Sequence, residues 1–378
     1  MRQGKYARAT ERSLSNEGAQ LLKRIKLPAD SICVSCIGWQ MGEVIMIDRP
    51  SFTNQQVNTI VPNSNIEPSF IYYSLRPRKQ ELLALGTMAG VRTPILNKSA
   101  FCDLKVRLPP LPIQRRIAGT LSVYDELIEN NQRRIKTLES MARALYRESL
   151  GSGSNPVAKQ PIIEAPYWRF ISENICTYSG TKRYYATADI DGLAITGQGI
   201  DYSFTDRPSR AQKQPIPNSV WFARMKDTYK IAWYGPHNDD RVSGVVLSSG
   251  FAGFEARDME MWPLLFLTIS SKEFHAQKDL YCTGATQMSL NNEGLARIAL
   301  PFPEEDAARW LGRNAGPILN AISGLQETCS NLRRTRDLLL PRLLSGQIAD
   351  DELVQVTESE DLASVEDLHL DRTGTPHK

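Results

Sequence analysis

An internal repeat is the feature of this sequence that most constrains its fold. The octapeptide at residues 90–97, GVRTPILN, recurs at residues 284–291 as GATQMSLN, at an offset of 194 residues (284 − 90). A short stretch of alternating apolar residues follows each copy and ends in proline, at Pro109 and Pro303. Because the flanking pattern is preserved with the octapeptide, the repeat predicts two halves that are built alike.

Beyond these prolines, each half enters a long stretch with the heptad spacing of a helix. Apolar residues recur at steps of three and four, interrupted by Asn131 in the first stretch and Arg336 in the second. At 1.5 Å per residue each stretch is about 50 Å long, which exceeds the core of either half. We therefore expect two antiparallel helices that bury their stripes against each other as a coiled coil, rather than two ordinary core helices. The predicted seam positions are Ile117, Leu121, Tyr124, Ile128, Ile135, Leu138, Leu311, Ile318, Ile322, Leu325, Leu332 and Leu339.

The two helices divide the rest of the sequence into globular regions of mixed α/β (α+β) class, related by a pseudo-two-fold internal repeat. Short alternating apolar runs predict strands, and one amphipathic helix precedes the repeated octapeptide in each region. The predicted parts are a domain at 1–109, a helix at 110–149, a linker at 150–161, a domain at 162–303, a helix at 304–346 and an acidic tail at 347–378. Within the domains we expect strands at 31–38, 43–47, 220–225, 230–235 and 244–250, and helices at 68–86 and 261–277.

Charge is distributed unevenly along the chain. The net charge is +3, but residues 349–378 carry nine acidic residues against Arg372 and Lys378, so the rest of the chain carries +10 (3 + 7). A basic body suits a polyanionic partner such as nucleic acid. The acidic tail has no aromatic residue, and we expect it to be largely disordered.

The composition favours a cytoplasmic protein without a bound metal or other cofactor. The first residues are polar and basic rather than a secretory leader, and no apolar run is long enough to cross a membrane. The six scattered cysteines are therefore expected to be reduced. Cys33 and Cys36 form a lone C-x-x-C with no second pair and no nearby histidine, which favours buried strand residues over zinc ligands.

No motif indicates catalysis. The four histidines are dispersed, no Walker A loop is present, and the Gly197-Gln198-Gly199 stretch lacks the third glycine of a dinucleotide site. The N/D-P-P-Y/F tetrapeptide of an amino-methyltransferase is missing, and no acidic cluster with a lysine resembles a nuclease site. Together these absences argue against an enzyme.

Basic and amide side chains on predicted loops are the candidates for DNA contact. Lysine and arginine neutralise phosphates, and arginine, lysine, asparagine and glutamine read base edges. For any single residue a solvated surface charge is the simpler interpretation, but their grouping within a basic body favours DNA. The candidates are Arg92, Thr93, Lys182, Arg183, Tyr184, Arg207, Arg210, Arg224, Lys226, Thr286 and Gln287.

Several segments resemble the type I restriction-modification DNA specificity subunit, or S subunit. They are residues 52–63, 90–101, 332–348 and, above all, 108–139. The resemblance implies two target-recognition domains that each read one half of a split site in double-stranded DNA, and two antiparallel spacer helices. It also implies that the chain is not an enzyme, that it binds two methyltransferase subunits, and that restriction motor subunits join the larger complex.

The first domain departs from this pattern. In the second domain, residues 166–199 precede the portion that resembles the start of the sequence, and the first domain has no counterpart of them. Either the true start lies upstream or recognition by the first domain is impaired. Three alternatives therefore stay open: a remnant S subunit with one working recognition domain, a coiled-coil adaptor that binds only protein, and an undetected methyltransferase or nuclease.

Overall fold

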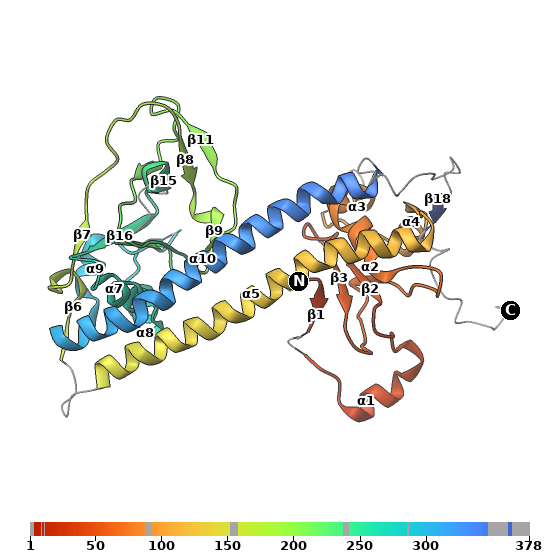
Figure 1. Cartoon of the computed structure of the whole chain (residues 1–378), viewed down its shortest axis with the longest axis horizontal. Coiled ribbons are helices and arrows are strands. Elements are labelled where there is room, and N and C mark those ends of the chain that lie inside the picture. Colours follow the sequence, from red (N-terminus) through yellow and green to blue (C-terminus); the bar gives the residue numbers. More distant parts are fainter. Residues whose placement is uncertain are drawn as a thin grey trace. The chain divides into compact units, whose positions relative to one another are not determined.

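The computed structural model describes residues 4–8, 10, 12–87, 92–151, 158–236, 242–285, 287–346 and 362–364. The chain divides into two compact units (Figure 1), of which the first comprises residues 1–131 and 328–378 and the second residues 132–327. The first unit is thus assembled from both ends of the chain. The division cuts through both long helices instead of setting them apart from the globular regions.

The long helices are α5 (Leu111–Gly151) and α10 (Glu305–Leu344), with 41 and 40 residues (Figure 1). In the first unit, Arg336 pairs with Asp125, and Cys329 Sγ lies 3.8 Å from the carbonyl oxygen of Ile128. The numbering rises along one helix as it falls along the other, so the two helices are antiparallel there. In the second unit, Ala142 of α5 shares a hydrophobic core with α10. The prediction of two long antiparallel helices is confirmed.

The first unit contains a four-stranded sheet in the order β1-β3-β2-β4. Strand β2 runs antiparallel to both β3 and β4, and β1 runs parallel to β3. Ile32 and Ile60 on one face of the sheet share a core with Phe70 and Tyr73 of α2. The elements are β1 (Tyr6–Ala7), α1 (Asn16–Leu21), η1 (Lys23–Ile25), β2 (Ile32–Ser35), β3 (Val44–Ile47), β4 (Val57–Ile60), α2 (Pro68–Leu75), η2 (Arg76–Arg78), α3 (Lys79–Gly86) and α4 (Lys98–Cys102).

The second unit contains two four-stranded sheets and a small β10-β9 pair. The first sheet has the order β14-β13-β16-β7 and packs on α7, and the second has the order β11-β8-β15-β12. The strands are β7 (Trp168–Ile171), β8 (Lys182–Tyr185), β9 (Ile190–Asp191), β10 (Ala194–Ile195), β11 (Ile200–Tyr202), β12 (Ala211–Lys213), β13 (Ser219–Ala223), β14 (Ile231–Tyr234), β15 (Val245–Ser248) and β16 (Phe251–Ala256). The helices are η3 (Ile162–Glu164), η4 (Thr187–Asp189), α7 (Trp262–Ile269), α8 (Lys272–Leu280) and α9 (Asn292–Arg297).

All five strands predicted from the alternating runs are present, as β2, β3, β13, β14 and β15. The two amphipathic helices are each broken into two. The first breaks at the 3-10 turn η2, where Pro77 has no backbone N–H to continue the helix. The second breaks at Ser270–Ser271, because the Ser271 hydroxyl accepts from Phe274 N at 3.1 Å and begins a new helix.

Each unit also contains a short two-stranded pair formed by a strand that follows the repeated octapeptide and a strand that follows a long helix. In the second unit β17 (Ala299–Pro301) pairs with β6 (Lys159–Pro161), and in the first unit β5 (Lys105–Arg107) pairs with β18 (Leu362–Ser364). Both pairs are antiparallel. Strand β18 belongs to the acidic tail that was expected to be largely disordered, and the rest of that tail lies outside the described residues.

Candidate nucleic-acid interface

In the first unit, the loop that follows β2 is held against the repeated octapeptide by backbone hydrogen bonds. Leu96 N donates to the carbonyl oxygen of Cys36 at 2.9 Å, and Gly38 N donates to that of Pro94 at 2.9 Å. Residues 36–40 and residues 92–96 are therefore joined by main-chain hydrogen bonds beyond the end of the central strand.

The second unit repeats this arrangement beyond β13. Leu290 N donates to the carbonyl oxygen of Arg224 at 2.8 Å, and Lys226 N donates to that of Met288 at 3.0 Å. The octapeptide residues are related by 194 positions (290 − 96) and the loop residues by 188 (224 − 36). The backbone of this feature is thus the same in both units although its side chains differ.

We name these features by their residues. The first loop pair consists of residues 36–40 and 92–96, and the second loop pair consists of residues 224–228 and 287–290. Each lies at the end of its sheet's central strand, where exposed loops on a fixed scaffold commonly carry binding residues.

Helix α8 fixes the tip of the second loop pair. The side chain of Lys278 is fully buried (0% exposed), and its Nζ donates to the carbonyl oxygen of Met225 at 2.7 Å. Its neighbour Asp279 accepts from Asp227 N at 3.0 Å. This clamp holds Asp227 in the left-handed backbone region, at φ 55°, which non-glycine residues seldom adopt. The half-buried Lys226 at this tip extends past Met288, with Nζ 3.9 Å from Sδ.

Arg224 braces the second loop pair. Its guanidinium donates to the carbonyl oxygen of Leu290 and to Asn292 Oδ1, both at 3.0 Å. Burial lowers the pKa of Arg224, although the hydrogen bonds satisfy the charged form. Gln287, which belongs to the second loop pair, is exposed, and Thr286 lies outside the described residues.

The first loop pair presents an aromatic side chain that sequence reasoning missed. Trp39, at the tip of the first loop pair, is 62% exposed. Arg92 and Thr93, in the other segment of the same loop pair, are also exposed. The nearby Ile95 is 53% exposed. Trp39 occupies the place of Asp227 (39 + 188), so aligning the two loops through their strands is the signal that could have found it.

A second group of candidates lies on β8, in the other sheet of the second unit. Lys182 Nζ lies 4.9 Å from the centroid of the Tyr178 ring and donates to Gln214 Oε1 at 2.7 Å. Arg183 makes two hydrogen bonds to Asp201, at 2.7 and 2.6 Å, and Asp201 raises the pKa of this arginine.

Three further candidates belong to the same sheet or its connecting loop. Tyr184 meets Tyr202 edge to face, with ring centroids 6.3 Å apart. Arg207 stacks over Phe204 with its guanidinium carbon 3.7 Å from the ring centroid, and it donates to the carbonyl oxygen of Ala211 at 3.1 Å. Arg210 is exposed immediately before β12. Most cations of this sheet are thus held in place by neighbours.

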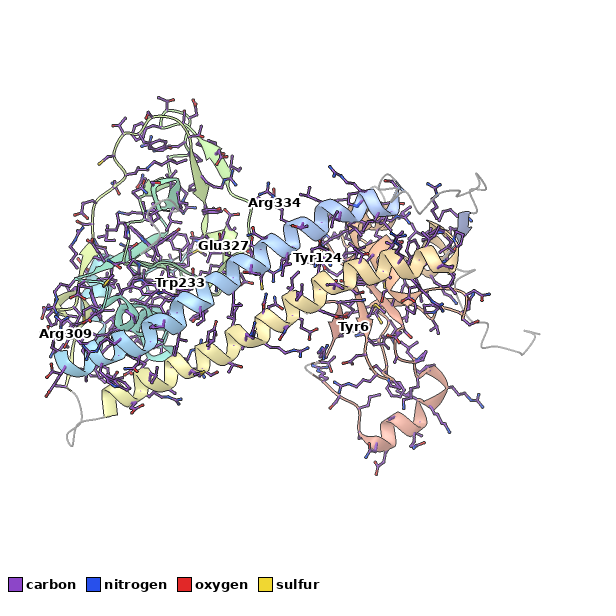
Figure 2. All side chains as sticks on the ribbon, viewed as in Figure 1. Tyr6, Tyr124, Trp233, Arg309, Glu327 and Arg334 are labelled. Carbon is purple, nitrogen blue, oxygen red and sulfur yellow. The ribbon has the colours of Figure 1, made fainter. Side chains whose placement is uncertain are left out.

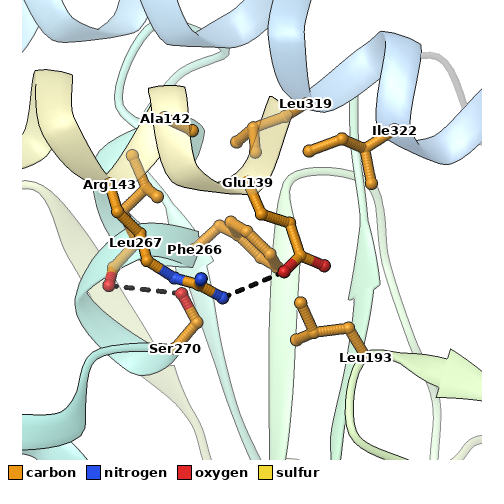
Figure 3. Close-up of a pocket in the computed structure, with 9 residues that line it drawn as sticks. All are labelled: Glu139, Ala142, Arg143, Leu193, Phe266, Leu267, Ser270, Leu319 and Ile322. Carbon is orange, nitrogen blue, oxygen red and sulfur yellow. Dashed lines mark hydrogen bonds and ion pairs between the residues drawn. The ribbon is translucent and has the colours of Figure 1, made fainter. Parts of the chain in front are cut away.

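The described part of the second unit includes an open hollow and a small cavity. An open hollow of about 340 Å³ beside β8 is lined by residues that include Cys176, Tyr178 and Lys182. A cavity of only about 10 Å³ lies where α5, α7 and α10 meet, next to the Glu139–Arg143 ion pair of 3.1 Å (Figure 3). The smaller cavity has room for about one water molecule, so it offers no ligand site.

The predicted seam positions are all buried or half-buried, including Tyr124 on α5 (Figure 2). Two α10 residues outside that set, Leu319 and Leu340, are 0% and 5% exposed, while the predicted Ile318 and Leu339 are only half-buried. The stripe is wider than a two-helix seam because Leu319 and Leu340 also pack into the cores of the globular regions. Leu319 and Leu340 therefore extend the apolar stripe of α10 beyond the predicted seam positions.

The cysteines and the possible metal ligands do not form a further site among the described residues. Cys33 lies within β2 and Cys36 directly after it, and both are buried. Among the described residues, no three histidine, cysteine or acidic side chains gather as a metal site. No helix in the described part of the chain is both long and apolar enough to span a membrane.

Comparison with known proteins yields one consistent result. Residues 3–140 match the family described as type I restriction modification DNA specificity domain. Over 331 residues the chain is 30% identical to the putative type I restriction enzyme MjaX specificity subunit of Methanocaldococcus jannaschii, a match that covers 82% of this chain and 75% of that protein.

Two further matches differ in extent. The type I restriction enzyme HindI specificity subunit of Haemophilus influenzae is 34% identical over 127 residues, which cover 32% of this chain and only 27% of that protein. Among solved structures, a type I restriction-modification system S subunit from M. genitalium has a TM-score of 0.50 and 17% identity, with 84% of this chain and 83% of that chain covered. The latter likeness concerns the fold alone.

Proposed function

Because the chain belongs to the family of type I restriction enzyme specificity subunits, we propose that it is the non-catalytic subunit that gives a restriction-modification complex its DNA sequence specificity. In this proposal each unit reads one half of a split site. The observation that carries it is the loop pair, which has one backbone in both units and different side chains on it. A common scaffold with variable side chains is what two readers of different half-sites require.

The charges support this assignment. Residues 1–348 carry +10 by formal count (+3 overall, −7 in the tail), so phosphate contacts would add sequence-independent affinity. Lys226 and Gln287 of the second loop pair, and Trp39 and Arg92 of the first, would contact bases or adjacent phosphates. The fixed cations on β8 and the exposed Arg210 would follow the backbone of the same half-site. Arg224 would act by holding the second loop pair in position.

In the same proposal, α5 and α10 act as the spacer. A helix of 41 residues is about 60 Å long at 1.5 Å per residue, which is close to two turns of B-DNA at ~34 Å per turn. The exposed faces of these helices would bind the methyltransferase subunits, and restriction motor subunits would join the larger complex. The chain alone would neither methylate nor cut DNA.

The decisive experiment compares host methylomes with and without the gene. We expect one bipartite motif to lose its methylation, and a duplex carrying that motif to bind the purified complex more tightly than a duplex with both half-sites scrambled. Removing one heptad from both helices should shift the preferred gap between half-sites. An unchanged methylome together with no binding to any duplex would instead support the protein-binding adaptor, and a motif with a single half would support a remnant subunit with one working domain.

A further inference from the structure

The last turn of α8 holds the second loop pair through two consecutive side chains. The ammonium of the buried Lys278 donates to the carbonyl oxygen of Met225 at 2.7 Å and lies 2.7 Å from Asp279 Oδ1. The same carboxylate oxygen accepts from Asp227 N at 3.0 Å. A buried ammonium is costly unless it is paired and hydrogen-bonded, and here its partners fix one carbonyl oxygen and one amide of the loop.

A thiol adds a third contact to the same loop. Cys282, which follows α8, is 5% exposed, and its Sγ lies 3.6 Å from the carbonyl oxygen of Arg224. The main chain of residues 224–227 is therefore held at three points by residues 278–282. Lys278 and Cys282 are too deeply buried to contact DNA, so they can influence base recognition only by positioning the loop.

The first unit has no equivalent of this clamp at the corresponding positions. Helices α2 and α7 begin 194 residues apart (262 − 68), as the octapeptides do, so α3 aligns with α8 at the same offset. Lys278 and Asp279 then correspond to Ala84 and Leu85, both of which are exposed. Neither of these side chains can donate or accept a hydrogen bond, so the first loop pair must be held in another way.

A buried glycine at the end of α3 takes that role. A Cβ on Gly86 would collide with Met41 Cε and would lie 3.1 Å from Leu96 N. Met41 is buried directly after the first loop, and Ile95 N donates to the carbonyl oxygen of Gly86 at 3.0 Å. The missing side chain thus lets the end of α3 pack against Met41 and the octapeptide together. The corresponding residue of the second unit, Leu280 (86 + 194), is 72% exposed, so a side chain fits there.

We propose that Lys278 and Asp279 are positioning residues for base recognition by the second unit, and that Gly86 is the positioning residue of the first. This inference rests on the proposed function, in which each loop pair contacts one half-site. Groups that bind a partner specifically must be held within about 0.5 Å of their productive geometry by the residues behind them. Because the two devices share no residue, the preference for one half-site can be lost while the preference for the other is kept.

The Lys278→Met variant tests the clamp, because it keeps a long apolar side chain but removes the donor. The carbonyl oxygen of Met225 still accepts from Thr228 Oγ1 at 2.6 Å, and Asp279 is 28% exposed to water, so we expect this variant to fold. The purified complex is titrated with the cognate duplex and with duplexes in which one half-site is scrambled. We expect the preference for one intact half-site to fall about ten-fold, which is within the range that one base pair contributes.

Two readouts separate positioning from direct contact or from a general structural defect. The slope of log affinity against log salt should stay unchanged for Lys278→Met, because a buried ammonium neutralises no phosphate. Lys272→Met, which removes an exposed lysine of the same helix, is the matched control and should keep both half-site preferences. An equal loss of affinity for the cognate and both scrambled duplexes would show a merely structural role and would overturn the proposal.

The Gly86→Ala variant provides the reciprocal test in the first unit. Alanine is favoured over glycine within a helix, so the main effect should be a displacement of the first loop pair. We expect the half-site preference that Lys278→Met leaves intact to fall in this variant, and the other preference to be kept. Loss of the same half-site preference in both variants would overturn the assignment of separate devices.

Amide hydrogen exchange on the full chain follows the loop without DNA. Asp279→Ala should speed exchange at residues 226–228, whereas residues 219–223 of β13 should keep their protection. Unchanged exchange at 226–228 would overturn the role of the clamp. In the titrations, a parent complex that prefers neither half-site would overturn the proposed function itself. A parent complex that prefers both, with variants that keep both preferences, would overturn the present inference alone.

Discussion

Arg336 of α10 donates to Asp125 of α5, and both side chains are withdrawn from solvent, at 4% and 10% exposure. Tyr73 of α2 donates to the second carboxylate oxygen of Asp125 at 2.6 Å. Despite the cost of burial, the neighbouring carboxylates of Asp125 and Asp337 raise the pKa of Arg336. A polar residue in an apolar stripe can fix the register of a helix pair, and this ion pair ties both helices to the globular region of the first unit.

We therefore predict that Arg336→Met destabilises the first unit by about 3 kcal/mol, because the buried carboxylate of Asp125 loses its nearer countercharge and keeps only the more distant pairing with Arg76 Nη1 at 3.7 Å. The D125N/R336M double variant should recover most of this loss, since the asparagine still accepts from Tyr73. Urea unfolding measures both effects. Glu81→Gln, which removes the more exposed Arg78–Glu81 pair of 2.6 Å, is the control and should cost well under 1 kcal/mol. Equal losses in all three variants would contradict the idea of a register-fixing pair.

Lys226→Ala should weaken DNA binding uniformly across sequences if the lysine contacts a phosphate. The slope of log affinity against log salt should then fall by about one unit. Titrating a cognate duplex from low to moderate salt gives this slope. The exposed Lys272 on α8 provides a matched control of the same charge. An unchanged slope for Lys226→Ala would remove this residue from the interface.

Trp39→Ala should reduce affinity about ten-fold without reducing stability, because a ring that is 62% exposed adds little to the core but can make apolar contact with a base edge in a groove. Fluorescence of the labelled cognate duplex measures affinity, and thermal unfolding measures stability. The control is Leu21→Ala, which truncates an 87% exposed apolar residue of α1 in the same unit. The same comparison on duplexes with one half-site scrambled would show which half-site Trp39 contacts. Equal affinities of the parent and Trp39→Ala for the cognate duplex would contradict the prediction.

Acid should weaken the second unit through His275. Burial, followed by the nearby charge of Lys278, lowers the pKa of His275 from its ordinary value of 6.5 to about 4. The neutral ring therefore favours the folded state fully above pH 6.5, and this contribution declines as the pH falls to about 4, by at most about 3 kcal/mol. Unfolding free energies between pH 7 and pH 4.5 should fall more steeply for the parent than for His275→Phe. Parallel curves would show that His275 does not titrate as described.

The parts that follow from local periodicity could be predicted from the sequence. The heptad stripes predict α5 and α10. The short apolar runs at 31–38 and 220–225 predict the central strands β2 and β13, which are largely buried on both faces. The stripe alone could not predict Leu319 and Leu340, since their burial depends on the globular cores that pack beside the helices.

The roles of single cations were harder to predict. Arg224 reads as a free basic residue at a strand end, and only the fold shows its guanidinium donating to Leu290 and Asn292. Trp39 escaped notice because the relation between the loops (39 to 227) is 188 residues, whereas the octapeptides repeat at 194. Because the offset between equivalent residues differs from segment to segment, the equivalence of Trp39 and Asp227 becomes visible only when the strands of the two units are aligned.

The loop pairs have a consequence for how such a protein can change over generations. Their shape depends on main-chain hydrogen bonds, such as Gly38 to Pro94 and Lys226 to Met288, which any substitution that tolerates the local backbone leaves intact. Mutations at the tips can therefore be inherited without loss of folding, and in the proposed function this would let one unit acquire a new half-site preference while the other keeps its own. Immunity against foreign DNA would benefit from that freedom, because an invader adapted to one motif meets a different one after a single exchange.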